Sequence, residues 1–427
     1  MKIDNSPARG TRDLLPDVVA ARDHVAGRIE EVYRRFGYRR IETPALERIE
    51  RLTGGQGGEN EKLIFQVLRR GLSSELPAGT DPRELVDLGL RFDLTVPLAR
   101  YYSQYRSELP QPFRSFQFGP VWRAERPQKG RYRQFHQCDI DLIGEQGVLA
   151  EVELIEATTQ ALAAVGLSGT TVRLSDRRLL AALASACGVP EEAQAGFFIT
   201  VDKLDKIGWD GVGEELRDQR GVSAEVVERV RGAIESLSEA PAGKVVDVLA
   251  DVVPTVPEQV TRDLATTISC LEQFPEQAAR WTFDPTLVRG MGYYTGQIFE
   301  VSHPAAAGSI AGGGRYDQLI GRFLGTDVPA CGFSIGFERI VDLATAPVPA
   351  DHVAVLYEAD VPVEQALDVA RRLRGEGRTV SVVRRSGKLS AQLDRLEGTH
   401  VTSVVHVQNE HDAHQLPPER KLRGESE

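Results

Sequence analysis

The sequence has few of the residues that mark a secreted, metal-binding or membrane protein. Four cysteines occur in 427 residues, far apart and without a C-x-x-C pair, which argues against a disulfide scaffold and a zinc ribbon. Charged residues interrupt each apolar stretch well before the roughly 20 residues that a membrane-spanning helix needs, and the N-terminus MKIDNSPARG lacks the apolar core of a signal peptide. We therefore expect a protein of the reducing cytosol, without a membrane segment.

The chain also lacks an excess of positive charge and two common nucleotide-binding motifs. It has 51 Lys and Arg against 62 Asp and Glu, a formal net charge of −11, which argues against a protein that coats nucleic acid through a basic surface but leaves a local basic site open. Neither the P-loop pattern nor the Rossmann glycine pattern occurs. A length of 427 residues suggests two or three domains.

Periodicity predicts a mixed α/β fold in several segments. Residues 1–165 and 281–344 carry strand-like runs, whereas 166–280 reads mainly as amphipathic helices, so we expect one catalytic sheet with a helical insertion. Alternating strand and helix patterns over 351–410 predict a small α/β domain with parallel strands. The polar stretch 411–427 is predicted to be disordered.

A charged hairpin is the first candidate functional element. Residues 119–137, GPVWRAERPQKGRYRQFHQ, read as strand, flexible tip and strand with five cations. Arg123 on the first strand offers a bidentate fork for phosphate or carboxylate, and Arg131 and Arg133 share one face of the second strand. Such a hairpin could clamp a triphosphate and contact a polynucleotide at its tip. The alternative is a solvated charged hairpin, which the surrounding aromatic residues make less favourable.

Carboxylates form a second candidate site. Gln137, Asp139 and Asp141 alternate on one predicted strand and therefore point the same way, and we expect the same of Asp93 and Thr95 in RFDLT. Buried carboxylates need a partner, because an unpaired buried charge is costly. That partner is either a ligand ammonium or imidazole, or an internal arginine.

Two further motifs place a cation beside aromatic or glycine residues. In LVRGMGYYTGQIFEV, Arg289 sits at a strand end and is followed by Tyr293 and Tyr294. In CGFSIGFERI, a glycine precedes a helical run with Arg339, which could meet an anionic ligand at the helix N-terminus. The run GGG in AGGGRYDQLIGRF would allow close backbone approach to a ligand, although a flexible turn is its commoner meaning.

Together these motifs resemble the class II aminoacyl-tRNA synthetases, and specifically the histidyl-tRNA synthetase family. The matching segments are RGTRDLLP (9–16), GYRRIETPALE (37–47), the hairpin, LVRGMGYYTG and CGFSIGFERI, which reach to about residue 344 in the family's order. The resemblance implies an antiparallel catalytic sheet flanked by helices, a helical insertion and a C-terminal α/β domain that reads the anticodon. It also implies a homodimer formed through the segment around Pro44.

The resemblance further implies an ATP-dependent ligase of cytoplasmic protein biosynthesis. Such an enzyme activates L-histidine with ATP and Mg²⁺ to histidyl-adenylate and transfers it to the 3′ end of histidine tRNA, whose acceptor end the hairpin tip at 126–133 would contact. No metal ligand of the protein itself is expected. The implied catalytic residues, Arg123, Arg289 and Arg339, would converge on one triphosphate. The implied histidine-binding residues are Asp93, Leu94, Thr95, Arg123, Gln137, Asp141, Arg289, Tyr293 and Tyr294, and the implied ATP-binding residues are Arg123, Glu125, Arg131, Arg133 and Arg339.

Two departures from the family pattern keep other functions open. Met291 and Gly292 stand where the family usually has Leu-Asp before the tyrosine pair, and the C-terminal domain looks cut short after VTSVVHVQNE. One alternative is a paralogue that passes an aminoacyl-adenylate to a small molecule or protein amine. The other is a catalytically silent regulatory subunit of histidine biosynthesis, against which the three arginines argue.

Overall fold

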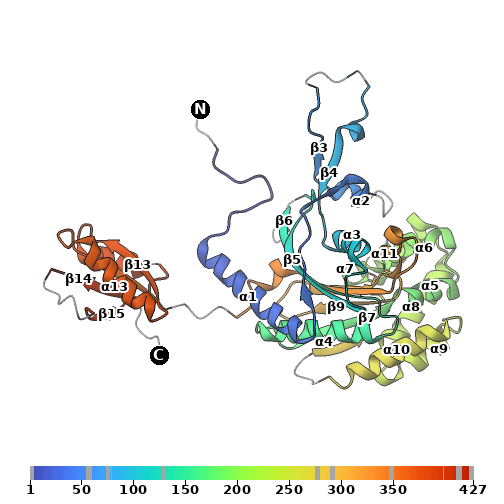
Figure 1. Ribbon diagram of the computed structural model, residues 1–427. Helices are drawn as coiled ribbons and strands as arrows, with labels where there is room; N and C mark the ends of the chain where they lie inside the picture. The colour runs from blue at the N-terminus through green and yellow to red at the C-terminus, as the bar shows by residue number, and fades with distance from the viewer. Residues whose placement is uncertain are drawn as a thin grey trace. The chain divides into compact units, whose positions relative to one another are not determined.

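The computed structural model describes residues 4–53, 60–73, 77, 79–126, 131–274, 279–288, 294–345, 351–397, 399–409 and 416–422. The chain forms two compact units, one of residues 1–14 and 22–345 and one of residues 15–21 and 346–427 (Figure 1). Among the described helices, none is both long and apolar enough to span a lipid bilayer.

An eight-stranded sheet organises the larger unit. Its neighbouring strands are antiparallel except for one parallel pair at each edge. This arrangement confirms the expected antiparallel catalytic sheet. In spatial order the strands are β1 (Arg39–Arg40), β5 (Phe113–Trp122), β6 (Gln134–Ile143), β11 (Ala330–Ile335), β10 (Ser309–Arg315), β9 (Gln297–Ser302), β7 (Thr170–Asp176) and β8 (Ala279–Phe283).

The two faces of this sheet differ, because successive side chains of a strand point to opposite sides. On β6, Cys138, Ile140 and Leu142 face one side and are fully buried. The helices α1 (Pro16–Arg35) and α4 (Leu149–Ala164) pack against this apolar side, and α4 runs along the sheet in Figure 1. These side chains belong to an apolar cluster that extends into both helices, and their burial stabilises the unit.

The opposite face carries the polar residues of β6, and helices cover part of it. There α3 (Thr95–Tyr105) packs on α11 (Asp317–Leu324), and both join a smaller cluster with Phe113, Ile143 and Tyr316. A small antiparallel sheet precedes α3 in the chain. Its elements are β2 (Leu46–Arg48), α2 (Ile49–Thr53), the 3₁₀ helices Asn60–Leu63 and Pro82–Leu85, β3 (Gln66–Leu68) and β4 (Val86–Leu90).

The expectation that Asp93 and Thr95 alternate along one strand is wrong. Strand β4 ends at Leu90, and Asp93 Oδ1 accepts a hydrogen bond of 3.1 Å from the backbone N–H of Val96 in the first turn of α3. Asp is favoured at this position because it satisfies an N–H group that has no partner within the helix.

The helical insertion begins later in the chain than its sequence pattern indicates. Its helices lie between the parallel neighbours β7 and β8 of the main sheet. Strand β7 lies wholly inside the range 166–280, and β8 begins at the end of that range. The elements of the insertion are α5 (Arg177–Ala186), α6 (Glu191–Val201), α7 (Leu204–Arg220), α8 (Ala224–Ser238), the 3₁₀ helix Ala242–Lys244, α9 (Val245–Val252) and α10 (Glu258–Leu271).

The smaller unit is an α/β domain with the strand order β13-β12-β14-β15. Its first three strands are parallel, as the sequence predicts, and β15 is antiparallel to β14. The prediction of a disordered tail is therefore wrong for β15, a fully exposed edge strand that needs no apolar pattern to pair; residues 410–415 and 423–427 lie outside the described residues. The elements are β12 (His352–Tyr357), α13 (Val363–Gly375), β13 (Thr379–Arg384), α14 (Leu389–Glu397), β14 (Ser403–Val407) and β15 (Glu419–Lys421).

Candidate active site

The strand register assembles a polar site on the face of the main sheet opposite α4. Gln117 of β5 and Ser334 of β11 both lie beside Asp139 of β6. Two residues along, Gly332 lies beside Asp141. Because residues paired across strands point to the same face, these groups form one continuous surface.

The two aspartates of β6 are almost completely buried, at 4% and 3% exposure, and hydrogen-bond to neutral groups. Asp139 accepts from the Ser334 hydroxyl at 2.5 Å and from the Gln137 amide at 3.2 Å. Asp141 Oδ1 accepts from the Tyr316 hydroxyl at 2.5 Å. In the described part of the chain, neither aspartate has an arginine partner, and Asp141 Oδ2 and Gln137 Oε1 are buried without a hydrogen bond. Such acceptors are available to a ligand.

Burial raises the pKa of each carboxyl group on this face. It raises the pKa of Asp141 to about 7, against a lowering by the hydrogen bond from Tyr316. Burial, followed by the nearby charge of Asp141, raises the pKa of Asp139 well above its usual range. The pKa of Asp93 is also raised by burial, which the Val96 N–H and Arg123 oppose. Carboxylates that repel one another in a dry site favour a cationic ligand.

Arg123 follows β5 and is held by one edge of its guanidinium group. Its Nε donates to the Phe92 carbonyl at 3.0 Å, and the guanidinium carbon lies 5.1 Å from the centre of the Phe135 ring. Among the described residues, its two terminal nitrogens have no hydrogen bond. The charge of Arg123 also lowers the pKa of Asp93, so the two side chains share one region. This arrangement leaves a fixed fork for an anion.

The ten paired positions of β5 and β6 confirm the predicted hairpin, whose tip at 127–130 lies outside the described residues. Arg131 and Arg133 precede β6 rather than lying on it. Arg131 is 62% exposed, with Nη1 4.0 Å from the Glu125 carboxylate. Arg133 Nε donates to the Glu125 carbonyl at 3.1 Å. The two arginines therefore differ, because one faces solvent and the other braces the hairpin.

Arg339 lies in α12 (Phe337–Ile340), directly after β11, and donates to the Ser309 carbonyl at the start of β10. Strands β5 and β11 are both antiparallel to β6, so their carboxyl ends lie at the same edge of the sheet. Arg123 and Arg339 therefore follow strands that end at one edge. Arg289 and Tyr293 lie outside the described residues, so the expected convergence of three arginines stays a prediction.

The glycine run 312–314 lies within β10 and is not a flexible turn. A Cβ atom at Gly313 would lie 2.0 Å from the Gly332 carbonyl oxygen, and one at Gly314 would lie 3.1 Å from a ring carbon of Tyr294. At Gly332 a Cβ atom would lie 2.1 Å from Asp141 Oδ1. A side chain is excluded at Gly313 by the backbone of the neighbouring strand and at Gly332 by the Asp141 carboxylate, so glycine is required at both positions.

Sequence reasoning missed Tyr316 and Ser334, the hydroxyl partners of the two aspartates. Tyr316 directly follows the GGGR segment, so the available sequence signal was a tyrosine close to a run of glycines. Ser334 shows no signal of its own, since only the pairing of β11 with β6 brings it to Asp139. Leu94 is buried, and its carbonyl accepts from the Gln117 amide at 3.1 Å; the next residue, Thr95, begins α3.

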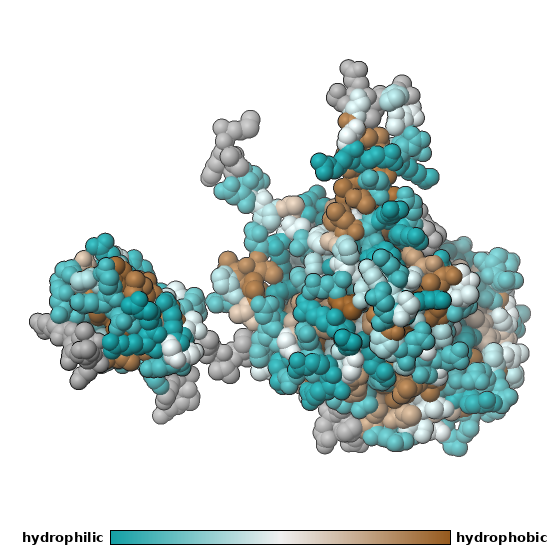
Figure 2. Space-filling model, in the orientation of Figure 1, coloured by the Kyte–Doolittle hydropathy of each residue, from teal (hydrophilic) through white to brown (hydrophobic). Residues whose placement is uncertain are grey.

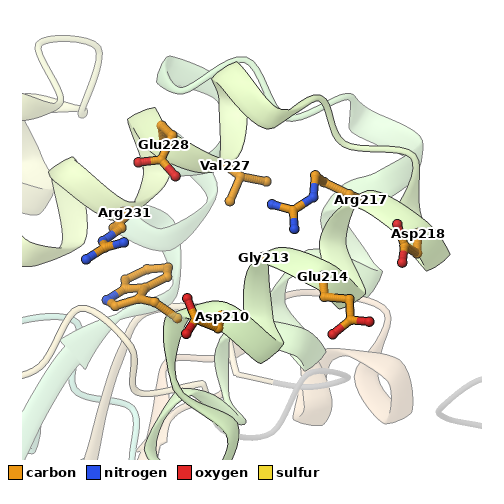
Figure 3. A pocket seen from close by; sticks show the side chains of 9 residues that line it. Asp210, Gly213, Glu214, Arg217, Asp218, Val227, Glu228 and Arg231 are labelled. Atoms are coloured by element: carbon orange, nitrogen blue, oxygen red, sulfur yellow. The ribbon is translucent and has the colours of Figure 1, made fainter.

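A separate hollow of about 430 Å³ lies in the helical insertion between α7 and α8 (Figure 3). In Figure 3, Arg217 of α7 points toward Val227 of α8. The hollow contains none of the residues that the sequence predicts for catalysis or binding. Its lining is Trp209, Asp210, Gly213, Glu214, Arg217, Asp218, Val227, Glu228 and Arg231.

The large antiparallel sheet, the charged hairpin and the polar face define a class II aminoacyl-tRNA synthetase fold. A sequence model described as histidyl-tRNA synthetase matches residues 10–340. A histidine–tRNA ligase of Leifsonia xyli subsp. xyli is 47% identical over 411 residues, which cover 94% of this chain and 95% of that protein. The chain belongs to the histidyl-tRNA synthetase family.

Solved structures agree with this assignment. The crystal structure of histidyl-tRNA synthetase from a Nostoc species has a TM-score of 0.78 at 27% identity, covering 95% of this chain and 92% of that one. A Bacillus halodurans protein, described as an ATP phosphoribosyltransferase regulatory subunit/histidyl-tRNA synthetase, also has a TM-score of 0.78 and covers 95% of this chain and 99% of that one. At 22% identity, this second likeness shows the fold alone.

Proposed function

We propose that this protein is a histidine–tRNA ligase: it activates L-histidine with ATP and joins the histidyl group to the 3′ end of histidine tRNA. The observation that carries the proposal is 47% identity, over 94% of the chain, with a protein of that name. The buried carboxyl groups and the fixed fork of Arg123 support it, because they suit an amino acid with a cationic ammonium and an anionic carboxylate.

The polar face would bind the amino acid. The carboxylate of Asp93 and the hydroxyl of Thr95 would hold the α-ammonium group. The Gln137 side chain and the unpaired Oδ2 of Asp141 would accept hydrogen bonds from histidine, with Tyr293 and Tyr294 lining the imidazole pocket. A pocket built on such hydrogen bonds discriminates strongly against apolar analogues, which would leave its buried polar groups unpaired.

The first chemical step would be attack of the histidine carboxylate on the α-phosphorus of ATP. A new O–P bond forms, the bond to the β-phosphate breaks, and pyrophosphate leaves. Arg123 and Arg289 would stabilise the negative charge that builds on the α-phosphate, and Arg339 would hold the γ-phosphate. Glu125 would position the adenine end, while Arg131 and Arg133 would add ATP contacts from the hairpin.

Mg²⁺ would enter as part of the Mg–ATP substrate. Among the described residues, no group of three or more metal-ligating side chains could hold a metal ion. Arginines and substrate-bound Mg²⁺ would share the neutralisation of charge.

The second step would transfer the histidyl group to tRNA. A hydroxyl group of the terminal ribose attacks the carbonyl carbon of the adenylate and loses its proton. A new ester bond forms, the bond to the phosphate oxygen breaks, and AMP leaves with that electron pair. The hairpin tip at 126–133 would contact the acceptor end, and the domain at 351–410 would read the anticodon. The smaller unit, which contains this domain, has four paired strands.

We further propose that the protein is a homodimer in the cytoplasm. The three-stranded sheet that follows Pro44 exposes Leu46 and Leu68, at 44% and 63%. Apolar residues gather over β3 and β4 in Figure 2. An exposed apolar surface of this kind is typical of protein–protein contacts. Neither alternative function has a comparable observation in its favour, since the likeness to a regulatory subunit is one of fold.

Two assays test the function in sequence. The first is ATP–pyrophosphate exchange, which should depend on L-histidine. If no amino acid supports exchange, the proposal is overturned and the regulatory alternative is left. The second is charging of purified histidine tRNA by the same preparation, with Arg289→Ala as the inactive control. Exchange without charging would favour an acceptor other than tRNA.

A further inference from the structure

We propose that the buried ion pair between Arg315 and Glu151 is a positioning device for the amino-acid pocket. It fixes Tyr316 and, through the hydroxyl of Tyr316, the carboxyl group of Asp141. The identity of the bound amino acid rests on the function proposed above, whereas the mechanical role of the pair does not.

The pair is bidentate and almost fully buried. Arg315 Nε and Nη2 donate to the two carboxylate oxygens of Glu151, each at 2.7 Å. The side chains are 9% and 2% exposed. The remaining donors of Arg315 reach the Gly147 carbonyl at 2.9 Å and the Glu145 carbonyl at 3.1 Å. One guanidinium group thus joins β10, the loop before α4 and α4 itself.

This pair lies on the opposite side of the sheet from the pocket. Arg315 belongs to the row that faces α4, where Glu151 lies, and Tyr316 is the next residue of the chain. Because neighbouring residues of an extended chain point to opposite sides, locking Arg315 against α4 directs Tyr316 toward the polar face. Tyr316 is 2% exposed, and its hydroxyl lies 2.5 Å from Asp141.

The residue after Tyr316 is locked as well. Asp317 Oδ1 accepts from the Ala330 N–H at 2.9 Å and from Arg315 at 3.3 Å, and the Asp317 N–H donates to the Thr295 hydroxyl at 3.1 Å. Tyr316 itself donates its N–H to the Ala330 carbonyl at 2.7 Å. Bonds on both flanks therefore determine where the phenol ring can lie.

A buried ion pair is a costly way to gain stability, since apolar residues of similar volume often stabilise as well or better. Its advantage is a defined geometry: a bidentate pair fixes both distance and orientation. The space that it helps to define is tight. A Cβ atom at Gly332 would lie 2.1 Å from Asp141 Oδ1 and 3.1 Å from a ring carbon of Tyr316.

The test compares Glu151→Gln with Glu153→Gln in the full-length protein. Glu153 lies on the same helix and forms a bidentate pair with Arg114, also with two bonds of 2.7 Å, so both variants lose one ion pair of the same form. We expect both to lower the thermal midpoint. Only Glu151→Gln should raise KM for histidine in the exchange assay, by about 10-fold, with KM for ATP unchanged, because a small displacement in a pocket is costly.

The pH profile gives a second readout that a general loss of stability would not move. The Tyr316 hydrogen bond lowers the pKa of Asp141, so its loss should move the acid limb of kcat/KM for histidine to higher pH in Glu151→Gln and leave it in place in Glu153→Gln. The ionisable groups that act on Asp141 or respond to it are Tyr316, Asp93, Asp139 and Cys331.

Hydrogen exchange keeps the test independent of activity. The amides of residues 312–319 should exchange faster in Glu151→Gln than in Glu153→Gln. If Glu151→Gln does not fold, Arg315→Lys and Asp317→Asn, which each weaken one flank of Tyr316, should show the same pattern. The inference would be overturned if the test and control variants had the same KM for histidine, the same acid limb of the pH profile and the same rates of amide hydrogen exchange. A wild-type protein without histidine-dependent exchange would instead overturn the proposed function.

Discussion

The two faces of β6 are equally buried but chemically opposite. Ile140 on one face and Asp141 on the other are neighbours in sequence and are 0% and 3% exposed. Ile140 contacts a continuous apolar core, whereas Asp141 keeps an oxygen atom without a partner among the described residues. Burial of Ile140 stabilises the fold, and burial of an ionised Asp141 opposes it.

If the polar face binds histidine as proposed, one strand serves both stability and binding. The apolar face needs only apolar side chains of suitable shape, so it constrains the sequence loosely. The polar face works only with particular hydroxyl, amide and glycine residues at register positions set by other strands. Substitutions on the two faces should therefore affect different measurements.

Removal of Arg123 should have the largest effect. In Arg123→Ala the fork at the end of β5 is lost, and histidine-dependent exchange should fall by about 10²–10³-fold because charge on the α-phosphate is no longer stabilised. Unfolding by urea should change little. The matched control is Arg28→Ala, which breaks an exposed pair with Glu31. Exchange within threefold of wild type in Arg123→Ala would contradict the assignment.

Asp141→Asn should turn the polar face into a more stable but inactive surface. Burial raises the pKa of Asp141 to about 7 from 3.8, so between these values the folded protein holds a proton that the unfolded chain has lost. The free energy of unfolding therefore falls as the pH rises through this window. Asparagine has no proton to lose, so its advantage over wild type should grow by up to about 4 kcal/mol between pH 4 and pH 8.

Urea unfolding followed by tryptophan fluorescence measures this difference, because Trp122, Trp209 and Trp281 all lie in the larger unit. Histidine activation by the variant should be lost at each pH. A difference in stability that does not depend on pH would show that Asp141 does not titrate in this range.

Glu338→Gln should have a smaller effect, confined to ATP. The Glu338 carboxylate accepts from Arg12 and Arg22 at 2.7 Å and from the His136 N–H at 3.1 Å, next to Arg339. Glutamine cannot neutralise two guanidinium groups, so α12 should shift and KM for ATP should rise about 10-fold, with KM for histidine unchanged. The control is Glu30→Gln, which breaks an exposed pair with Arg40. Equal changes in both KM values would argue for a general loss of structure.

Ile140→Val should have the smallest effect and should act on stability alone. Removal of one methylene group from the apolar face should lower the free energy of unfolding by about 0.5–1.5 kcal/mol. Both KM values should stay at the wild-type level. A change in histidine binding would mean that packing on one face is transmitted to the other.

Local sequence patterns predicted the helices and strands of this fold better than the register in which the strands pair. The hairpin at Arg123 could be predicted because its turn and its charges are close in sequence. The start of α3 could have been predicted as well, since Asp93 and Pro97 both mark the first turn of a helix. Strand β15 could not, because a fully exposed edge strand has no apolar pattern.

Sequence reasoning singled out the charged residues of the polar face and missed their neutral hydrogen-bond partners. Asp141 stood out as a carboxylate on a strand, but its partner Tyr316 directly follows β10, about 175 residues away in sequence. Ser334 reaches Asp139 only through the pairing of β11 with β6. Contacts between such distant segments depend on topology, which periodicity along the chain does not encode.

The position of the helical insertion has a consequence for synthesis on the ribosome. Asp141 on β6 pairs beside Gly332 on β11, about 190 residues later. At roughly 5–20 residues per second, β6 emerges about 10–40 s before its neighbour exists. During that interval an open strand edge with two uncompensated acidic groups must avoid pairing with another nascent chain. The acidic groups that we propose to bind ligand in the folded protein would then also reduce association of the nascent chain.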